Sequence, residues 1–190
     1  MIDAAPDDAH ALTVLLHRWQ DGDVVAREEL MALVYRRVRA IAGQSLAQHA
    51  QATMTPTELA HEALIRLLAA DAGWADRRHF FHAVAQATRQ VIVDHARRRL
   101  SEKRGQGQAI LPLSQAPELP GGGADDDVVR VDEAIVALAK EDPRQAQVVE
   151  LSYFGGFSRE EIGAALELSV ATVDRDLRFA RAWLKDALSP

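Results

Sequence analysis

The chain has 190 residues, 48% of them hydrophobic, which is enough for one large or two small domains with ordinary cores. Its formal net charge of -6 argues against indiscriminate binding of nucleic acid, and the absence of cysteine excludes disulfides, thiol catalysis and zinc bound by cysteine. The first residues are acidic where a signal peptide would be basic, and no apolar run approaches the roughly 20 residues of a membrane span, so we expect a soluble cytoplasmic protein without membrane insertion.

Apolar residues at spacings of three and four predict two helices near the N-terminus. The residues are Leu12, Leu15, Leu16 and Trp19 for the first helix and Leu30, Val34, Val38 and Ile41 for the second. A third helix is predicted from Thr55 to about Ala70. Thr55 is placed to be its N-cap, Pro56 to occupy the first helical position, and Glu58 to close a capping box.

A fourth helix is predicted from about Arg77 to Arg104, and its C-terminal end is strongly basic. The basic residues there are Arg97, Arg98, Arg99, Lys103 and Arg104, and Arg89 stands two turns earlier. Such a stripe can follow a phosphate backbone. The alternative is that cations simply stabilise a helix C-terminus through the helix dipole.

The loop before this helix mixes an aromatic ring with positive charge. Trp74 precedes Arg77 and Arg78, a combination that suits an unstacked base and its phosphate. Phe80 and Phe81 are more typical of a core. His79 and His82 share a helix face, but no third ligand stands at metal-binding spacing, so we expect no metal and no cofactor. Nothing in the sequence resembles a catalytic triad or a nucleophile elbow, so we expect no enzyme activity.

Residues 105–127 are rich in glycine and proline with almost no periodicity, which predicts a flexible linker. The linker divides an N-terminal domain, residues 1–104, from a C-terminal domain, residues 128–190. In the second domain we expect helices over Val128 to Lys140 and Pro143 to Phe154, with Gly155 and Gly156 ending the latter.

The last thirty residues predict a helix-turn-helix. Ser158 and Glu161 form the pattern of a capping box at the start of the first helix, and Ser169 restarts the chain as a second N-cap. The turn between them requires a left-handed residue, and Glu167 at that position would cost roughly 1 kcal/mol.

The second helix of this pair has one apolar and one basic side. Val173, Leu177, Ala180 and Leu184 predict its buried stripe. Thr172, Arg175, Arg178 and Arg181 are then left pointing outward from a helix whose N-terminal end would enter a major groove. The alternative interpretation is an amphipathic helical hairpin with a solvated basic face.

The chain resembles the extracytoplasmic-function (ECF) sigma factors, the smallest members of the sigma-70 superfamily of bacterial transcription initiators. The resemblance rests on the order and spacing of TELAHEALIRLL, HFFHAVAQATRQVIVDHARRR, the Gly/Pro-rich segment and the block from Asp142 to Leu184. It implies an all-helical fold of two four-helix domains. The first would bind the clamp helices of core RNA polymerase and melt the promoter -10 element, and the second would read the -35 element.

The resemblance also implies roles for individual residues. Those for the -35 element are Ser169, Thr172, Arg175, Arg178 and Arg181; those for the -10 element are Trp74, Arg89, Gln90, Asp94, Arg97 and Arg98; those for core polymerase are Glu58, Glu62 and Arg66. Gln90 stands where the family often has Asn, which implies different preferred bases. Asp174 stands where a Lys is common, which should reduce non-specific affinity.

The third helix departs from the family pattern at its start. Members commonly carry an acidic run of the form Asp-Ala-Glu-Asp-Leu, whereas this chain has Thr55, Pro56, Thr57, Glu58 and Leu59. Phosphorylation would return roughly -1.5 to -2 charges per site. We therefore predict activation by a Ser/Thr protein kinase, at Thr57 before Thr55. The alternative is that Thr55 is only an N-cap and Thr57 only an exposed helix residue.

Two other functions remain open from the sequence. One is a stand-alone helix-turn-helix transcriptional regulator, and the other is a protein-interaction module that sequesters a regulator without binding DNA. Only a sigma factor requires a stoichiometric complex with core polymerase, and only the regulator should bind duplex DNA tightly by itself.

Overall fold

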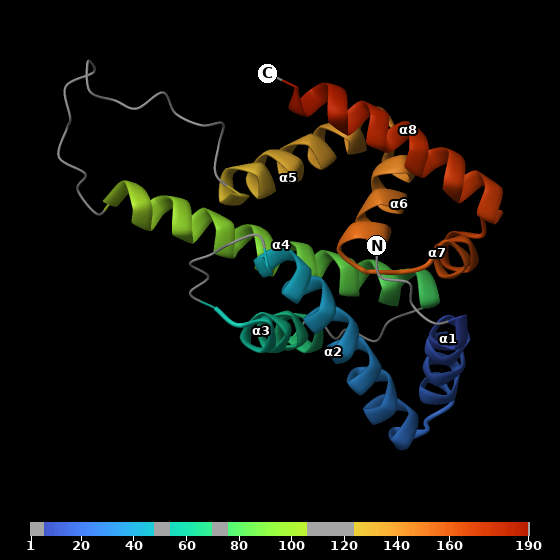
Figure 1. Ribbon diagram of the computed structural model, residues 1–190. Coiled ribbons are helices and arrows are strands. Elements are labelled where there is room, and N and C mark those ends of the chain that lie inside the picture. The colour runs from blue at the N-terminus through green and yellow to red at the C-terminus, as the bar shows by residue number, and fades with distance from the viewer. Residues whose placement is uncertain (1–5, 48–53, 70–75, 106–123, 190) are drawn as a thin grey trace, which may run out of the picture.

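The computed structural model describes residues 6–47, 54–69, 76–105 and 124–189, and in these residues the chain is all-helical (Figure 1). The helices in chain order are α1 (Pro6–Gln20), α2 (Val24–Ala47), α3 (Pro56–Ala69), α4 (Arg77–Gly105), α5 (Ala124–Glu141), α6 (Pro143–Tyr153), α7 (Arg159–Leu166) and α8 (Val170–Leu188). The predicted all-α fold is therefore confirmed. None of the described helices is long and apolar enough to cross a membrane.

The helix starts follow from the capping residues. The Thr55 amide donates to Glu58 Oε2 over 2.7 Å, and the Glu58 amide donates back to Thr55 Oγ1 over 3.2 Å, which closes the box at the start of α3. Ser158 and Glu161 make the same reciprocal bonds at α7. At α8, Ser169 Oγ accepts from the Thr172 amide. Each of these bonds satisfies a backbone donor that a helix terminus leaves unpaired.

The helix α5 begins earlier than its apolar periodicity predicts. It starts at Ala124, inside the segment expected to be a linker, and three aspartates from Asp125 to Asp127 fill its first turn. Negative charge is favoured there because the unpaired amides give a helix N-terminus partial positive charge. Residues 106–123, the rest of the expected linker, lie outside the described part of the chain.

The N-terminal half of the molecule consists of α1 to α4 and the C-terminal half of α5 to α8. The long helix α4 lies in the middle, with α1 to α3 on one side and α5 to α8 on the other (Figure 1). Phe80 and Phe81 are fully buried, as expected for core residues. The ring of Phe81 lies 4.2 Å, centroid to centroid, from that of Phe157 in the C-terminal half. One apolar core therefore runs through both halves.

The two sets of helices on either side of the Gly/Pro-rich segment pack against each other. The N-terminal half of α4 contacts α6 and α7, and its C-terminal half contacts α5. Gly156, in the turn after α6, packs closely on α2: a Cβ at this position would lie 3.0 Å from Ile41 Cδ1. In the free chain the two halves form one packed body.

Candidate nucleic-acid interface

The turn between α7 and α8 is as tight as a helix-turn-helix requires. Glu167 adopts the predicted left-handed conformation with φ 58°, and the Leu168 amide donates to the Gly163 carbonyl over 2.8 Å. A Cβ at Gly163 would lie 2.7 Å from the Leu168 carbonyl oxygen. Gly163 therefore allows the turn to fold back closely on α7.

The helix α8 presents its faces as predicted. Val173, Leu177 and Ala180 are buried, and Leu184 is half-buried at the far end of the same stripe. Arg175, Arg178 and Arg181 are exposed. Thr172, which the sequence predicts to point outward, is half-buried, and its hydroxyl lies 2.8 Å from Ser169 Oγ at the helix start. A row of guanidinium groups thus lines the outer side of a helix that begins at a well-formed cap.

The arginines on α8 are held to different degrees. Arg181 Nε donates to the Tyr153 hydroxyl over 3.2 Å, and its guanidinium lies 6.0 Å from the centre of that ring. Arg178 Nε donates to the backbone carbonyl of Asp174, in its own helix, over 3.3 Å. Arg175 is two-thirds exposed and lies 3.7 Å from Asp176, a carboxylate that Arg144 already binds at 2.9 Å. Arg175 and Arg178 are therefore the side chains best placed to reach bases.

The side chain of Asp174 has a structural partner. Its carboxylate forms an ion pair with the guanidinium of Arg159, the first residue of α7. The acidic residue at a position where a Lys is common therefore joins the two helices of the motif.

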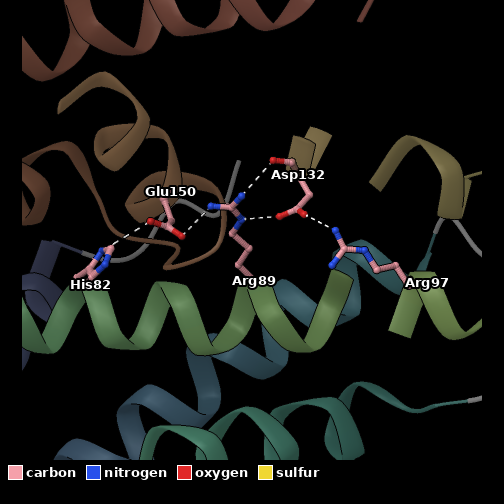
Figure 2. Close-up of polar contacts among 5 residues, drawn as sticks. All are labelled: His82, Arg89, Arg97, Asp132 and Glu150. Carbon is pink, nitrogen blue, oxygen red and sulfur yellow. Dashed lines mark hydrogen bonds and ion pairs between the residues drawn. The ribbon is translucent and has the colours of Figure 1, made fainter. Parts of the chain in front are cut away.

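The basic face of α4 is occupied by carboxylates from the C-terminal half (Figure 2). Arg89 Nε donates to Asp132 Oδ1 over 2.8 Å, and Arg89 Nη1 donates to Glu150 Oε1 over 3.1 Å. Arg89 Nη2 donates to the Asp132 backbone carbonyl over 3.0 Å. Arg97 Nη2 reaches the second carboxylate oxygen of Asp132 over 3.0 Å. Two of the residues expected to face the -10 element are thus paired within the chain.

A second group of residues joins α3 to α4. Arg66 lies between Glu62 on its own helix, at 2.7 Å, and Asp94 on α4, at 2.8 Å. Arg98 is mostly exposed and stands 3.9 Å from Glu62. Residues expected to contact core polymerase and residues expected to contact the -10 element therefore form one ionic network. Gln90 is exposed, and Trp74 lies outside the described residues.

The start of α3 distinguishes its two threonines. The Thr55 hydroxyl donates to Glu58 Oε2 over 3.0 Å as part of the capping box. Thr57 is half-buried in the first turn, so it is less exposed than its position in the sequence suggests. The pKa of Glu58 lies below its usual value because its carboxylate accepts hydrogen bonds from the Thr55 amide and hydroxyl. Glu58 therefore holds its negative charge at this end of the helix.

The family model for "ECF sigma factor" matches residues 9–190. The chain belongs to the ECF sigma factor family. Its role is that of an alternative sigma factor in transcription initiation, a DNA-binding role in which core RNA polymerase and promoter DNA are the partners. This is a family of transcription factors rather than of enzymes. No match was found among curated proteins or among solved structures.

Sequence reasoning missed the contacts that four acids of the C-terminal half of the sigma factor make with the N-terminal half. Asp125, Asp132, Glu150 and Glu161 are all buried, and each contacts a basic residue of the N-terminal half. For two of these acids, the sequence carries a signal in the apolar residues around them. Asp132 shares the apolar face of α5 with Ile135 and Val128, and Glu150 stands between Val149 and Leu151. A carboxylate in such a position needs a cationic partner, because an unpaired buried charge is very costly.

Within the described ranges, the sigma factor has no group of three or more histidine and acidic residues that could hold a metal ion. His82 lies instead beside Glu150, with 3.6 Å between Nδ1 and Oε2.

Proposed function

We propose that this sigma factor reads the -35 element through α8, reads and melts the -10 element through α4 and the loop before it, and grips the polymerase clamp helices through α3. The observation that carries the proposal is the outward row of Arg175, Arg178 and Arg181 on a helix capped by Ser169, in a tight helix-turn-helix. An α-helix fits the width of a major groove. There an exposed arginine can make bidentate hydrogen bonds to O6 and N7 of guanine.

Support for the -10 role comes from charge on α4. Arg89 and Arg97 lie on the side of the helix that faces α5, Arg98 is exposed toward α3, and Gln90 is exposed next to Arg89. Melting requires that a base be held out of the stack, which costs a few kcal/mol, and phosphate contacts and a pocket for the base can offset that cost. Trp74 is our proposed stacking partner from the preceding loop.

Support for the polymerase contact comes from α3. Glu58 is exposed, and Glu62 and Arg66 lie on the same helix with Ile65 and Leu68 exposed nearby. A surface of this kind, acidic around an apolar centre, suits a basic clamp helix.

We further propose that a Ser/Thr kinase activates the protein by phosphorylating Thr57. Thr57 is at the second position of α3, where a phosphate would meet the unpaired amides and positive end of the helix. Thr55 is the weaker candidate because its hydroxyl already closes the capping box. A phosphate on Thr57 would replace charge that the family's acidic run usually supplies, and it would bind clamp arginines through charge-assisted bonds.

Binding to core polymerase separates this proposal from the alternatives. The full chain, unmodified or phosphorylated, is mixed with core enzyme and passed over a size-exclusion column, and the isolated chain is titrated with duplex DNA. A sigma factor co-elutes with core enzyme in at least the phosphorylated form. A stand-alone regulator binds duplex tightly and does not co-elute, and an interaction module does neither.

A further inference from the structure

We infer that the free protein inhibits itself: buried carboxylates of its C-terminal half occupy the face of α4 that would bind the promoter strand, and the two halves must separate before that face can act. The inference rests on the proposed -10 role of α4. We call the four residues Asp125, Asp132, Glu150 and Glu161 the clasp acids.

The contact at Arg89 satisfies its guanidinium almost completely. Asp132 supplies a carboxylate oxygen and its backbone carbonyl, and Glu150 supplies a second carboxylate (Figure 2). The side chains of all three residues are at most 15% exposed. A phosphate group presents the same kind of charged oxygen to arginine that these carboxylates do. DNA therefore cannot bind Arg89 until Asp132 and Glu150 leave.

Two further ion pairs extend the clasp to both ends of the contact. Arg99 of α4 lies 3.3 Å from Asp125 of α5, with side chains 8% and 2% exposed. Arg37 of α2 lies 2.9 Å from Glu161 of α7, with side chains 7% and 1% exposed. Exposed ion pairs contribute little to the free energy of folding. A buried ion pair favours one arrangement of the helices, because breaking it leaves a buried charge without its partner. The closed form is therefore a specific state of the chain.

Aromatic contacts and hydrogen bonds between the two halves support the same closed arrangement. Phe81 packs on Phe157, and the guanidinium of Arg37 lies over the Phe157 ring at 5.1 Å. At the start of α4, Arg77 donates to the Ala164 carbonyl, and Arg78 donates to Gln147 over 3.4 Å. The interface thus joins α4 to α5, α6 and α7, and it joins α2 to α7 and to the turn before α7.

The clasp is also poised to open. Among the described residues, Nη2 of Arg37 and Nη1 of Arg99 are buried without a hydrogen-bond acceptor. Buried donors left in this condition oppose the closed form. Exchange of carboxylate for phosphate at Arg89 and Arg97 would conserve the number of charged contacts, so promoter DNA on core polymerase can compete with the clasp acids for the same arginines.

The test uses two measurements on the full chain. Because the sequence contains no cysteine, Ala40→Cys on α2 and Ala139→Cys on α5, both at exposed positions, allow a spin label on each half. Double electron-electron resonance then reports the distance between the halves. Affinity is measured with fluorescein-labelled single-stranded DNA of mixed sequence, which reports the phosphate contacts of α4.

The key variant is Asp132→Asn with Glu150→Gln. Its matched control is Asp127→Asn with Glu133→Gln, which changes the net charge equally at two exposed positions of α5. We expect the key variant to show longer distances and to bind single-stranded DNA more tightly by roughly five- to 150-fold, the usual range for a coupled equilibrium. The control should behave as wild type does. Circular dichroism establishes that each variant keeps its helices.

If the key variant does not fold, the label distance in the wild-type protein, measured with and without single-stranded DNA, tests the inference by itself. That distance should lengthen when single-stranded DNA saturates the protein. Wild-type protein that binds the DNA with its distance unchanged would overturn the inference while leaving the proposed -10 role intact. A key variant that opens but, like wild type, binds no DNA would instead contradict the -10 role of α4.

Discussion

Arg89 Nε on α4 lies 2.8 Å from Asp132 Oδ1 on α5, although the Gly/Pro-rich segment separates the two residues in the sequence. The first residue belongs to the helix proposed to read the -10 element, and the second belongs to the half that carries the helix-turn-helix. The free sigma factor therefore pairs a candidate DNA-binding cation with a carboxylate of its own chain. If α4 reads the -10 element as proposed, promoter binding replaces that pair.

The recognition helix gives the first prediction. Arg175→Ala and Arg178→Ala should each weaken binding to the cognate -35 duplex by about 1–3 kcal/mol if the arginines contact bases. Fluorescence anisotropy with cognate and scrambled duplexes measures the difference. Lys185→Ala, at the opposite end of α8, is the control and should have little effect on sequence preference. Unchanged promoter selection in both arginine variants would refute the assignment of α8.

Asp174→Lys tests the acidic position on the same helix. A cation there should raise affinity for all duplex sequences and steepen the dependence of binding on salt concentration, because one more phosphate contact becomes available. The variant also loses the ion pair between residue 174 and Arg159. In the wild-type protein the two side chains of this pair are 41% and 43% exposed. Such a pair contributes about 0–1 kcal/mol, so the melting temperature should fall only slightly. Weaker non-specific binding would show that Asp174 does not face DNA.

Promoter melting should depend on the end of α4. Arg97→Ala combined with Arg98→Ala should leave the -35 contacts of α8 in place and abolish open-complex formation, because both side chains are more than half exposed on the proposed -10 face. Permanganate reactivity of thymines near -10 is the measurement. Reactivity equal to wild type would mean that these arginines only stabilise the end of a helix. Loss of the Arg97 contact to Asp132 should also loosen the closed form.

Acid should destabilise the protein through His95. Burial, with help from Arg99, lowers the pKa of this histidine; Arg98 acts in the same direction, and Asp125 and Glu62 oppose it. The folded protein therefore keeps His95 neutral at a pH where the unfolded chain already binds the proton. The free energy of unfolding should fall as the pH drops below the ordinary histidine pKa of about 6.5.

The control for this prediction is His95→Gln. Urea unfolding at pH 7.5 and 5.5 gives the loss of stability for each protein, and the loss should be smaller in the variant. An equal loss in both proteins would assign the acid sensitivity to other groups.

Phosphorylation at Thr57 should control binding to core polymerase. Thr57→Ala should keep the helical fold but fail to gain affinity when treated with kinase, and Thr57→Glu should restore only part of the activity because one carboxylate carries less charge than a phosphate. Thr55→Ser, which keeps the capping hydroxyl, is the matched control and should behave as wild type does. Full affinity of the unmodified protein for core enzyme would show that no such switch exists.

The sequence predicts the local structure well because that structure depends on short-range chemistry. The N-caps at Thr55, Ser158 and Ser169, the left-handed Glu167 and the buried stripe of α8 all follow from residues a few positions apart. The contacts of Arg89 could not be predicted in this way, since its partners lie 43 and 61 positions away and require the packing of α4 on α5 and α6. A stretch of Gly and Pro indicates where a chain can bend, but it does not show whether the flanking domains touch.

Run-off transcription with core polymerase on a library of genomic fragments, using the unmodified and the Thr57-phosphorylated chain, tests the sigma-factor role and its phosphorylation switch most directly. Promoter-specific transcripts should appear only when the chain is added and should be far more abundant with the phosphorylated form. The absence of transcripts with either form, together with tight duplex binding by the isolated chain, would contradict the account and identify a stand-alone regulator.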